Sequence, residues 1–229
     1  MKKLVRKILD AVFPPLCPIC RDRLVEGEKI LCSGCLAELC VSKYKDIHNN
    51  SLAKNYWGVF PIESALNVFK FSLGNTLAQI IHHMKYFHNE ELCRFMGEIM
   101  AYDTRVEEML READALIPVP ITTEREKGRG YNQSQRICEG ISKTRKIEII
   151  TDVLIRKAFK NTQTAMSQHK RSRNIEGDFE MINSEKIEGK HVILVDDIIT
   201  TGATTRECIY SLRRVKGIRI SVLALGSTS

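Results

Sequence analysis

The chain has 229 residues, of which 43% are hydrophobic and 28% are charged, so it is long enough for one or two domains with buried cores. Its 13 glycines and 6 prolines are too few for a collagen-like or low-complexity protein. Even with prolines counted, no unbroken apolar run is longer than the 10 residues from Ala11 to Cys20, whereas a membrane-spanning helix needs about 18 apolar residues or more. We therefore expect no membrane span.

The formal net charge of +7 is concentrated in one segment of the chain. Residues 120–176 contain 13 Lys/Arg and 6 Asp/Glu, and the remainder of the chain is neutral. Such a segment is typical of a solvated loop or of a site for an anionic partner. The charge alone leaves both interpretations open.

The N-terminus lacks the pattern of a secretory signal, because Arg6, Lys7 and Asp10 interrupt its apolar residues. We therefore expect a cytoplasmic protein whose eight cysteines are reduced. Clustered cysteines in that compartment indicate a metal site or catalysis rather than a disulfide framework.

The N-terminal half is predicted to combine helices with a cysteine cluster, a linker and short strands. A helix is expected where apolar residues recur at helical spacing from Leu4 to Phe13, and the polar, turn-rich residues 41–55 are expected to form a linker. The remaining predicted elements of this half are strands within residues 57–71 and helices at 75–87 and 90–101.

From Asp114 onward, predicted strands and helices alternate, which implies a parallel sheet with right-handed crossovers and an α/β fold class. Strands are expected at residues 115–119, 153–155, 192–195 and 218–225, and helices at 134–143 and 204–215. Residues 156–178 are basic and polar, with little apolar periodicity, and are predicted to form an exposed arm. We expect two domains, one over residues 1–50 and one over residues 51–229.

Four cysteines near the N-terminus have the spacing of a metal site. The two Cys-x2-Cys pairs, Cys17 with Cys20 and Cys32 with Cys35, can bring four thiolates to one point, as in closed structural zinc sites. Redox thiols and a buried apolar pair are the alternatives. The other cysteines are expected to be buried thiols; they are Cys40, Cys93, Cys138 and Cys208.

The segment from Val192 to Thr204 (VILVDDIITTGAT) has the composition of a phosphate site. A buried strand delivers Asp196 and Asp197, and a loop of small residues then leads into a helix. Hydroxyls, backbone N–H groups and the helix dipole of such a loop favour an anion, and the two carboxylates stand where ribose hydroxyls or a metal could bind. A P-loop motif and a Gly-x-Gly-x-x-Gly motif are both absent from the sequence.

This segment resembles the PRPP-binding motif of type I phosphoribosyltransferases. Further segments follow the order seen in the ComF/GntX family, which the chain resembles from about Cys17 to Leu225; they are Lys85-Tyr86, Ile117–Pro120, Arg129–Gln133, Thr162–Thr164, Lys170–Asn174 and Phe179. The Ile-Pro-Val-Pro segment and the basic arm are also similar to amidophosphoribosyltransferases, whose glutaminase domain has no counterpart in this sequence.

The resemblance implies a type I phosphoribosyltransferase-like parallel sheet flanked by helices, with a small N-terminal zinc module of four cysteines. It implies that Asp196 and Asp197 are the catalytic pair and bind the ribose of PRPP, with Mg²⁺ bridging ribose and pyrophosphate. The 5′-phosphate would bind Thr200, Thr201, Gly202, Ala203 and Thr204, and the pyrophosphate loop would be Pro118, Val119 and Pro120. The cations expected to hold the pyrophosphate include Arg129, Arg171 and Arg173, with Arg125, Lys127, Arg156, Lys157, Lys160 and Lys170 as further candidates.

The resemblance also implies a role in handling single-stranded DNA or its nucleotides during DNA uptake in natural transformation. Single-stranded DNA and competence or DNA-processing proteins would then be partners besides PRPP. A metabolic phosphoribosyltransferase with an unidentified acceptor and a PRPP-sensing zinc adaptor without catalysis remain alternatives. Residues 57–113 would form the hood that selects an acceptor, residues 114–229 the core, and Tyr131, Phe159 and Phe179 could stack bases or pack in the core.

Overall fold

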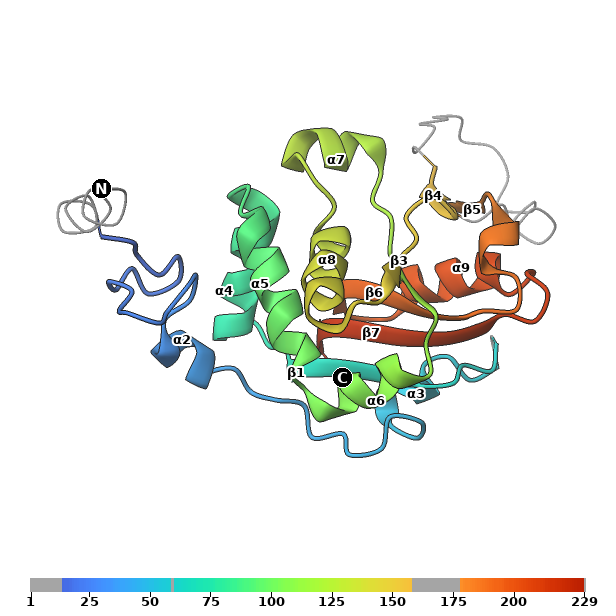
Figure 1. The fold of residues 1–229 in the computed structure, drawn as a ribbon, viewed down its shortest axis with the longest axis horizontal. Coiled ribbons are helices and arrows are strands. Elements are labelled where there is room, and N and C mark those ends of the chain that lie inside the picture. The colour runs from blue at the N-terminus through green and yellow to red at the C-terminus, as the bar shows by residue number, and fades with distance from the viewer. Residues whose placement is uncertain (1–13, 59, 158–177, 229) are drawn as a thin grey trace, which may run out of the picture.

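The computed structural model describes residues 14–58, 60–157 and 178–228, and a five-stranded parallel sheet forms its centre (Figure 1). The strand order is β1-β7-β6-β2-β3, and all four neighbouring pairs are parallel. The strands are β1 (Ala65–Lys70), β2 (Ala115–Pro118), β3 (Glu148–Ile149), β6 (His191–Ile199) and β7 (Arg219–Ser227). The predicted parallel α/β architecture is confirmed.

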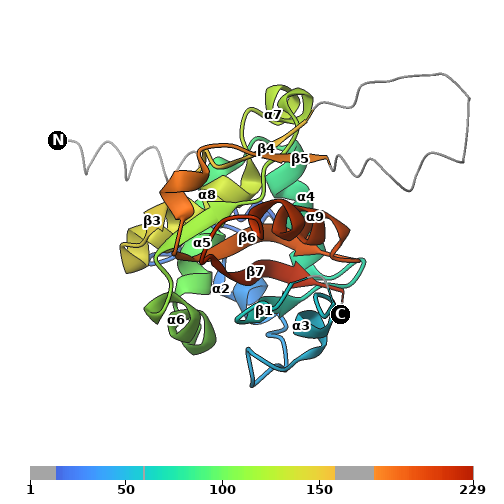
Figure 2. The ribbon, with the colours of Figure 1, turned by 90° about the vertical axis from the view of Figure 1, so that its right-hand side faces the viewer.

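Helices cover both faces of this sheet, and the core is divided accordingly (Figure 2). One core cluster joins Ile193 and Leu223 to the helices α4 (Thr76–Tyr86), α5 (Glu90–Ala101), α6 (Thr104–Arg111) and α8 (Gln133–Arg145). The other joins Leu194 and Val222 to α3 (Ser51–Lys54) and α9 (Ala203–Leu212). Successive residues of a strand point to opposite faces, so the continuous apolar runs of β6 and β7 serve both clusters.

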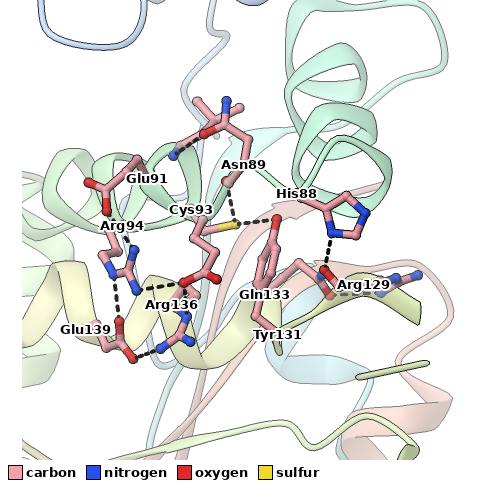
Figure 3. Close-up of polar contacts among 12 residues, drawn as sticks. His88, Asn89, Glu91, Cys93, Arg94, Arg129, Tyr131, Gln133, Arg136 and Glu139 are labelled. Atoms are coloured by element: carbon pink, nitrogen blue, oxygen red, sulfur yellow. Dashed lines mark hydrogen bonds and ion pairs between the residues drawn. The ribbon is translucent and has the colours of Figure 1, made fainter. Parts of the chain in front are cut away.

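The helices α5 and α8 approach each other closely on the first face. A Cβ atom added at Gly97 would lie 2.2 Å from the Ile137 carbonyl oxygen, and one at Gly140 would lie 2.0 Å from the Arg94 carbonyl oxygen. At the surface of the same interface, Arg94 binds Glu91 of its own helix and Glu139 of α8 (Figure 3). The start of α8, which reaches the candidate site, is therefore firmly held.

Most of the predicted helices agree with the structure to within a few residues. The helix predicted at 90–101 is α5 itself, and those predicted at 75–87, 134–143 and 204–215 correspond to α4, α8 and α9. The strand predicted at 153–155 is β4 (Leu154–Arg156), which pairs antiparallel with β5 (Phe179–Met181), and a 3-10 helix, η1 (Ser184–Ile187), follows. The predicted helix from Leu4 to Phe13 and most of the predicted basic arm lie outside the described residues.

Several elements were not predicted from the sequence. They are the helices α2 (Ser33–Ala37), α3, α6 and α7 (Thr123–Arg129) and the strands β3 and β5. The helix α7 has no buried residue and therefore no regular spacing of apolar residues.

The first part of the predicted linker at residues 41–55 is an edge segment instead. Residues 40–47 run antiparallel along β1, where the Ser42 N–H donates to the Val68 carbonyl oxygen at 2.8 Å. They cover the open edge of the sheet, which would otherwise present unpaired backbone groups.

No helix within the described ranges combines the length and the apolar character needed to cross a bilayer.

Candidate functional site

The four predicted zinc ligands come together in the structure. All four Sγ atoms lie within 4.8 Å of one another, with 3.8 Å between Cys17 and Cys35 and 3.5 Å between Cys20 and Cys32. Zinc–sulfur bonds of about 2.3 Å in a tetrahedron separate neighbouring sulfurs by about 3.8 Å. The cluster therefore has the dimensions of a closed zinc site with four thiolate ligands.

Local structure aims these thiols inward. Backbone hydrogen bonds close the first knuckle, where the Arg21 N–H donates to the Cys17 carbonyl oxygen at 3.0 Å, and Cys32 caps α2 (Ser33–Ala37) by accepting the Cys35 N–H at 3.3 Å. Burial and then the neighbouring thiols raise the pKa of Cys35. A divalent cation would reverse this effect and hold the four sulfurs as thiolates.

The module containing these cysteines packs on the side of the sheet that is covered by α4, α5, α6 and α8. Leu24, Leu31 and Leu39 belong to the same core cluster as α4 and α5, and in Figure 1 residues 14–32 lie beside those helices. Among the other cysteines, Cys93, Cys138 and Cys208 are buried as predicted, but the prediction was wrong for Cys40, which is exposed. Cys40 lies where the chain turns from the module toward the sheet edge, so one side of it faces solvent.

The predicted acid pair lies at the carboxyl end of β6, and both side chains are buried. The Ser134 hydroxyl donates to Asp196 Oδ1 at 3.2 Å, and the Asp197 N–H donates to the same oxygen at 2.8 Å. The ammonium of Lys85, from α4, lies 2.8 Å from Asp197 Oδ2. Each carboxylate therefore has a different partner, a hydroxyl for Asp196 and a cation for Asp197.

Burial, followed by the charge of Asp197, raises the pKa of Asp196 to about 7. Ser134 and the Lys85 ammonium oppose this effect only in part. A carboxylate in such an environment is stabilised by a hydrogen bond from a ligand hydroxyl or by a bound cation, because either interaction offsets the cost of its burial.

The five predicted phosphate-binding residues form the turn between β6 and α9. Gly202 has a φ of +72° and is the N-cap of α9, a backbone conformation that glycine adopts without strain. The turn from Thr200 to Thr204, with Asp196, lines a hollow of about 40 Å³. Since the first N–H groups of a helix have no intrahelical acceptor, this hollow offers backbone donors and a favourable dipole to an anion.

A larger cleft of about 170 Å³ opens beside this hollow and shares Asp196, Ile198 and Thr204 with it. Its lining combines the acid pair with the pyrophosphate-loop candidates Val119 and Pro120, whereas Pro118 is buried within β2. Four cationic side chains also line it, namely Lys85, Arg125, Arg129 and Arg156. With four cations against two carboxylates, the described lining favours an anionic ligand.

Several other side chains predicted for this site are not among the described residues; they are Phe159, Lys160, Lys170, Arg171 and Arg173. Lys127 is exposed on α7 and is not among the residues that line the cleft. The helix α7, which carries Arg125 and Arg129, stands away from the sheet in Figure 1.

Sequence reasoning missed the contributions of Gln133 and Ser134 to the cleft. Both follow Asn132, whose side chain caps α8 by accepting the Ser134 N–H at 3.0 Å and donates to the Val119 carbonyl oxygen at 2.9 Å. This residue therefore ties the start of α8 to the pyrophosphate-loop candidates. An asparagine cap directly after the β2 loop was the signal that could have revealed them.

Two aromatic residues considered for base stacking have structural roles instead. Tyr131 is buried between α4 and α8, where its hydroxyl donates to the Met84 carbonyl oxygen and approaches the Cys93 thiol (Figure 3). Phe179 is buried as well, and the Arg156 guanidinium lies 5.1 Å from its ring centre. This contact helps to hold Arg156 at the cleft.

Replacing Asp196 by Asn is expected to stabilise the protein at pH 8. The raised pKa of Asp196 means that the folded chain bears the cost of ionising a buried carboxyl above about pH 7, a cost on the order of 4 kcal/mol. That cost declines as the pH falls through the native pKa and disappears below the unfolded value near 4. Thermal unfolding should show a higher Tm for Asp196→Asn at pH 8 and equal values at pH 3.5; a Tm below that of the parent at pH 8 would contradict it.

Comparison with known proteins gives two matching domain families. Residues 141–228 match the phosphoribosyl transferase domain, and residues 8–45 match the double zinc ribbon domain. The competence protein F of Haemophilus influenzae is 26% identical over 234 aligned positions, covering 91% of this chain and 95% of the relative. A DNA utilization protein YhgH of Shigella flexneri is 27% identical over 155, covering 66% and 67%. The competence protein ComFC of Bacillus subtilis is 29% identical over 89, covering 39% and 34%.

Among solved structures, an allosteric regulatory enzyme of purine biosynthesis is 21% identical with a TM-score of 0.42. The match covers 61% of this chain and only 29% of that protein. A similarity at this level adds nothing to the argument from the sheet and the domain matches.

The parallel sheet and the matched domains together define a protein with a phosphoribosyltransferase-type domain and an N-terminal zinc ribbon. The four adjacent cysteines support the predicted structural zinc site. This pairing of domains, with relatives named competence protein F, ComFC and YhgH, is consistent with the predicted resemblance to the ComF family.

Proposed function

We propose that this chain is a PRPP-binding, ComF-type protein of the cytoplasm that acts in handling single-stranded DNA during DNA uptake. The observation that carries the proposal is a pair of adjacent hollows that share Asp196, one lined by the helix-capping turn and the other by the acid pair and four cations. The relatives named for competence and for DNA utilization supply the biological role. Residues 1–50 and 51–229 are proposed as its two domains, with 57–113 as the hood.

PRPP would lie across the two connected hollows. Its 5′-phosphate fits the turn from Thr200 to Thr204, whose backbone donors face the smaller hollow. Its ribose hydroxyls would then be within reach of Asp196, which lines both hollows, and of Asp197, which lines the larger one. The pyrophosphate would extend into the larger cleft, toward the arginines of α7 and β4.

The cation balance supports this orientation. Arg156 lines the cleft, and its Nε atom is buried without a hydrogen-bond partner among the described residues. A buried donor without an acceptor costs about 1–3 kcal/mol, so a phosphate oxygen at this position would relieve it. Arg125 and Arg129 offer two more guanidinium groups on the same side, and guanidinium groups bind phosphates with two parallel hydrogen bonds.

The acid pair also fits Mg²⁺, because carboxylate oxygens are the ligands this ion prefers. When bound with PRPP, the ion would neutralise charge on the pyrophosphate. Lys85 now occupies the neighbouring position as the cation paired with Asp197, so ligand binding has to shift or share that contact.

A phosphoribosyltransferase reaction is the second candidate function, in which pyrophosphate leaves and an acceptor takes the ribosyl group. The three arginines at the proposed pyrophosphate position favour it, because cations fixed beside a leaving group stabilise its developing charge. The acceptor would enter from the hood side, near α4.

The proposal is tested by fluorescence anisotropy with the full chain and a labelled 20-mer of thymidine. We expect the single strand to bind more tightly than a duplex of equal length, with an affinity that falls steeply with salt as phosphate contacts release counterions. Pyrophosphate release from PRPP and Mg²⁺ is followed in parallel. Lack of binding to the single strand at low salt would contradict the DNA role, and turnover with a free nucleobase in that case would favour the second candidate.

A further inference from the structure

The C-terminal end of α4 carries an exposed aromatic cluster, formed by His82, His83, Tyr86 and Phe87. Tyr86 and Phe87 are 63% and 54% exposed. The rings of His83 and Phe87 are stacked, with centres 4.4 Å apart and an angle of 17° between their planes, and those of His82 and Tyr86 lie 4.8 Å apart. Both pairs are four positions apart, so the helix holds the rings side by side on its surface.

This aromatic cluster lies between the cleft and the cysteine module. Lys85, within the same turn of α4, lines the cleft, and the ring of His88 is hydrogen bonded to the Arg129 carbonyl oxygen at 2.7 Å (Figure 3). On the other side, the positive charge of Arg21, in the first cysteine knuckle, acts on His83 and, after burial, lowers its pKa. Figure 1 shows the cysteine module beside α4.

Exposed rings in this position need an explanation, because two large aromatic side chains at more than half exposure leave apolar surface in water. Cations stand on both sides of them, with Arg21 on the module and Lys85 and Arg129 at the cleft. Aromatic faces flanked by cations are the features with which proteins hold unpaired bases and the phosphates that join them. A duplex hides its base faces and fits such a surface poorly.

We propose that this aromatic cluster is a stacking platform for bases of single-stranded DNA, whose phosphates pass between the cysteine module and the mouth of the cleft. The inference rests on the proposed function and names the part of the surface that would carry it. It places the strand next to the sugar-phosphate cleft, so that a nucleotide of the strand and a ligand of the cleft would be neighbours.

The double variant Tyr86→Ala/Phe87→Ala tests the platform in the full chain. Loss of one stacked base corresponds to about 1 kcal/mol or more, so we expect the Kd for the thymidine 20-mer to rise at least about fivefold. Tyr86→Phe keeps the ring and should bind as the parent does. Tyr102→Ala, which removes a 71% exposed ring at the end of α5, is the matched control and should also leave Kd unchanged.

An abasic 20-mer of the same charge separates stacking from phosphate contacts. The parent should bind it more weakly than the thymidine 20-mer, and the double variant should bind both oligomers equally.

Circular dichroism tests whether the double variant is folded. If the double variant is unfolded, the single variant Tyr86→Ala, which removes one exposed ring, replaces it. If the parent binds the thymidine 20-mer and the variants bind it equally well, the platform is wrong while the DNA role stands. If the parent binds neither oligomer, the proposed function itself fails.

Discussion

Replacing Cys32 by Ser is expected to abolish zinc binding and to unfold the N-terminal module. Cys32 acts twice, since its sulfur belongs to the four-cysteine cluster and also caps α2. The module buries few apolar side chains, and Leu24, Leu31 and Leu39 join the core cluster of α4 and α5 rather than forming a separate core. Structural zinc sites supply about 10–16 kcal/mol of apparent binding energy, so loss of one ligand should remove the folded state of the module.

Metal analysis and limited proteolysis measure this effect. The parent should hold about one zinc ion per chain and resist cleavage between residues 14 and 39, while Cys32→Ser should hold almost none and be cleaved there. Cys40→Ser is the matched control, because Cys40 is exposed and lies outside the cluster; it should keep its zinc. Full zinc content and unchanged protease resistance in Cys32→Ser would exclude a structural role for this centre.

The second large effect is expected from the double variant Asp196→Asn/Asp197→Asn. Both carboxylates are buried and line the larger cleft, and Asp196 also lines the smaller hollow; there they would accept hydrogen bonds from ribose hydroxyls or hold Mg²⁺. Losing two charged hydrogen-bonding or metal-binding groups, each contributing about 1.5–3 kcal/mol, should weaken PRPP binding by at least about 100-fold. Isothermal titration calorimetry with Mg²⁺ present measures this loss.

Damage to the fold can be distinguished from loss of the site. Because Asp196→Asn alone is expected to raise the Tm at pH 8, reduced binding together with increased stability would mark Asp196 as a residue kept for function. The exposed Asp152, paired with Lys186 on the surface, gives the matched control, and Asp152→Asn should bind PRPP as the parent does. If the acid-pair variant binds PRPP unchanged, these carboxylates are not the ribose site.

The sequence predicted the helices and strands in which apolar residues recur at regular spacing or form a continuous run. The helix α5 buries one face and has an asparagine cap at Asn89, and the apolar run of β6 is buried on both sides, so their spacing identified them. The helix α7 could not be found this way, because it contacts no core and only Thr122 and Gly130 mark its ends. The segment preceding Ala65 alternates like a strand, yet β1 begins only at Ala65, and before it the Glu63 N–H makes a hydrogen bond to the Ile220 carbonyl oxygen of β7.

The candidate site was predictable where one segment carries it and unpredictable where segments meet. The residues from Asp196 to Thr204 are continuous in sequence, so the acid pair and the turn were found together. Lys85 and Ser134 reach the acid pair from α4 and α8, and only tertiary packing places them there. The exposure of Cys40 is another consequence of packing, since nothing in its spacing distinguishes it from the buried cysteines.

A phosphorylated-sugar site at the carboxyl edge of the sheet is tested most directly by a calorimetric titration of the full chain with PRPP, with Mg²⁺ and then with EDTA. We expect one PRPP to bind per chain, to bind more weakly when Mg²⁺ is removed, and to be displaced by ribose 5-phosphate, which would bind the turn from Thr200 to Thr204. If neither PRPP nor ribose 5-phosphate binds at millimolar concentration, the cleft at the carboxyl edge of the sheet is not a site for a phosphorylated sugar.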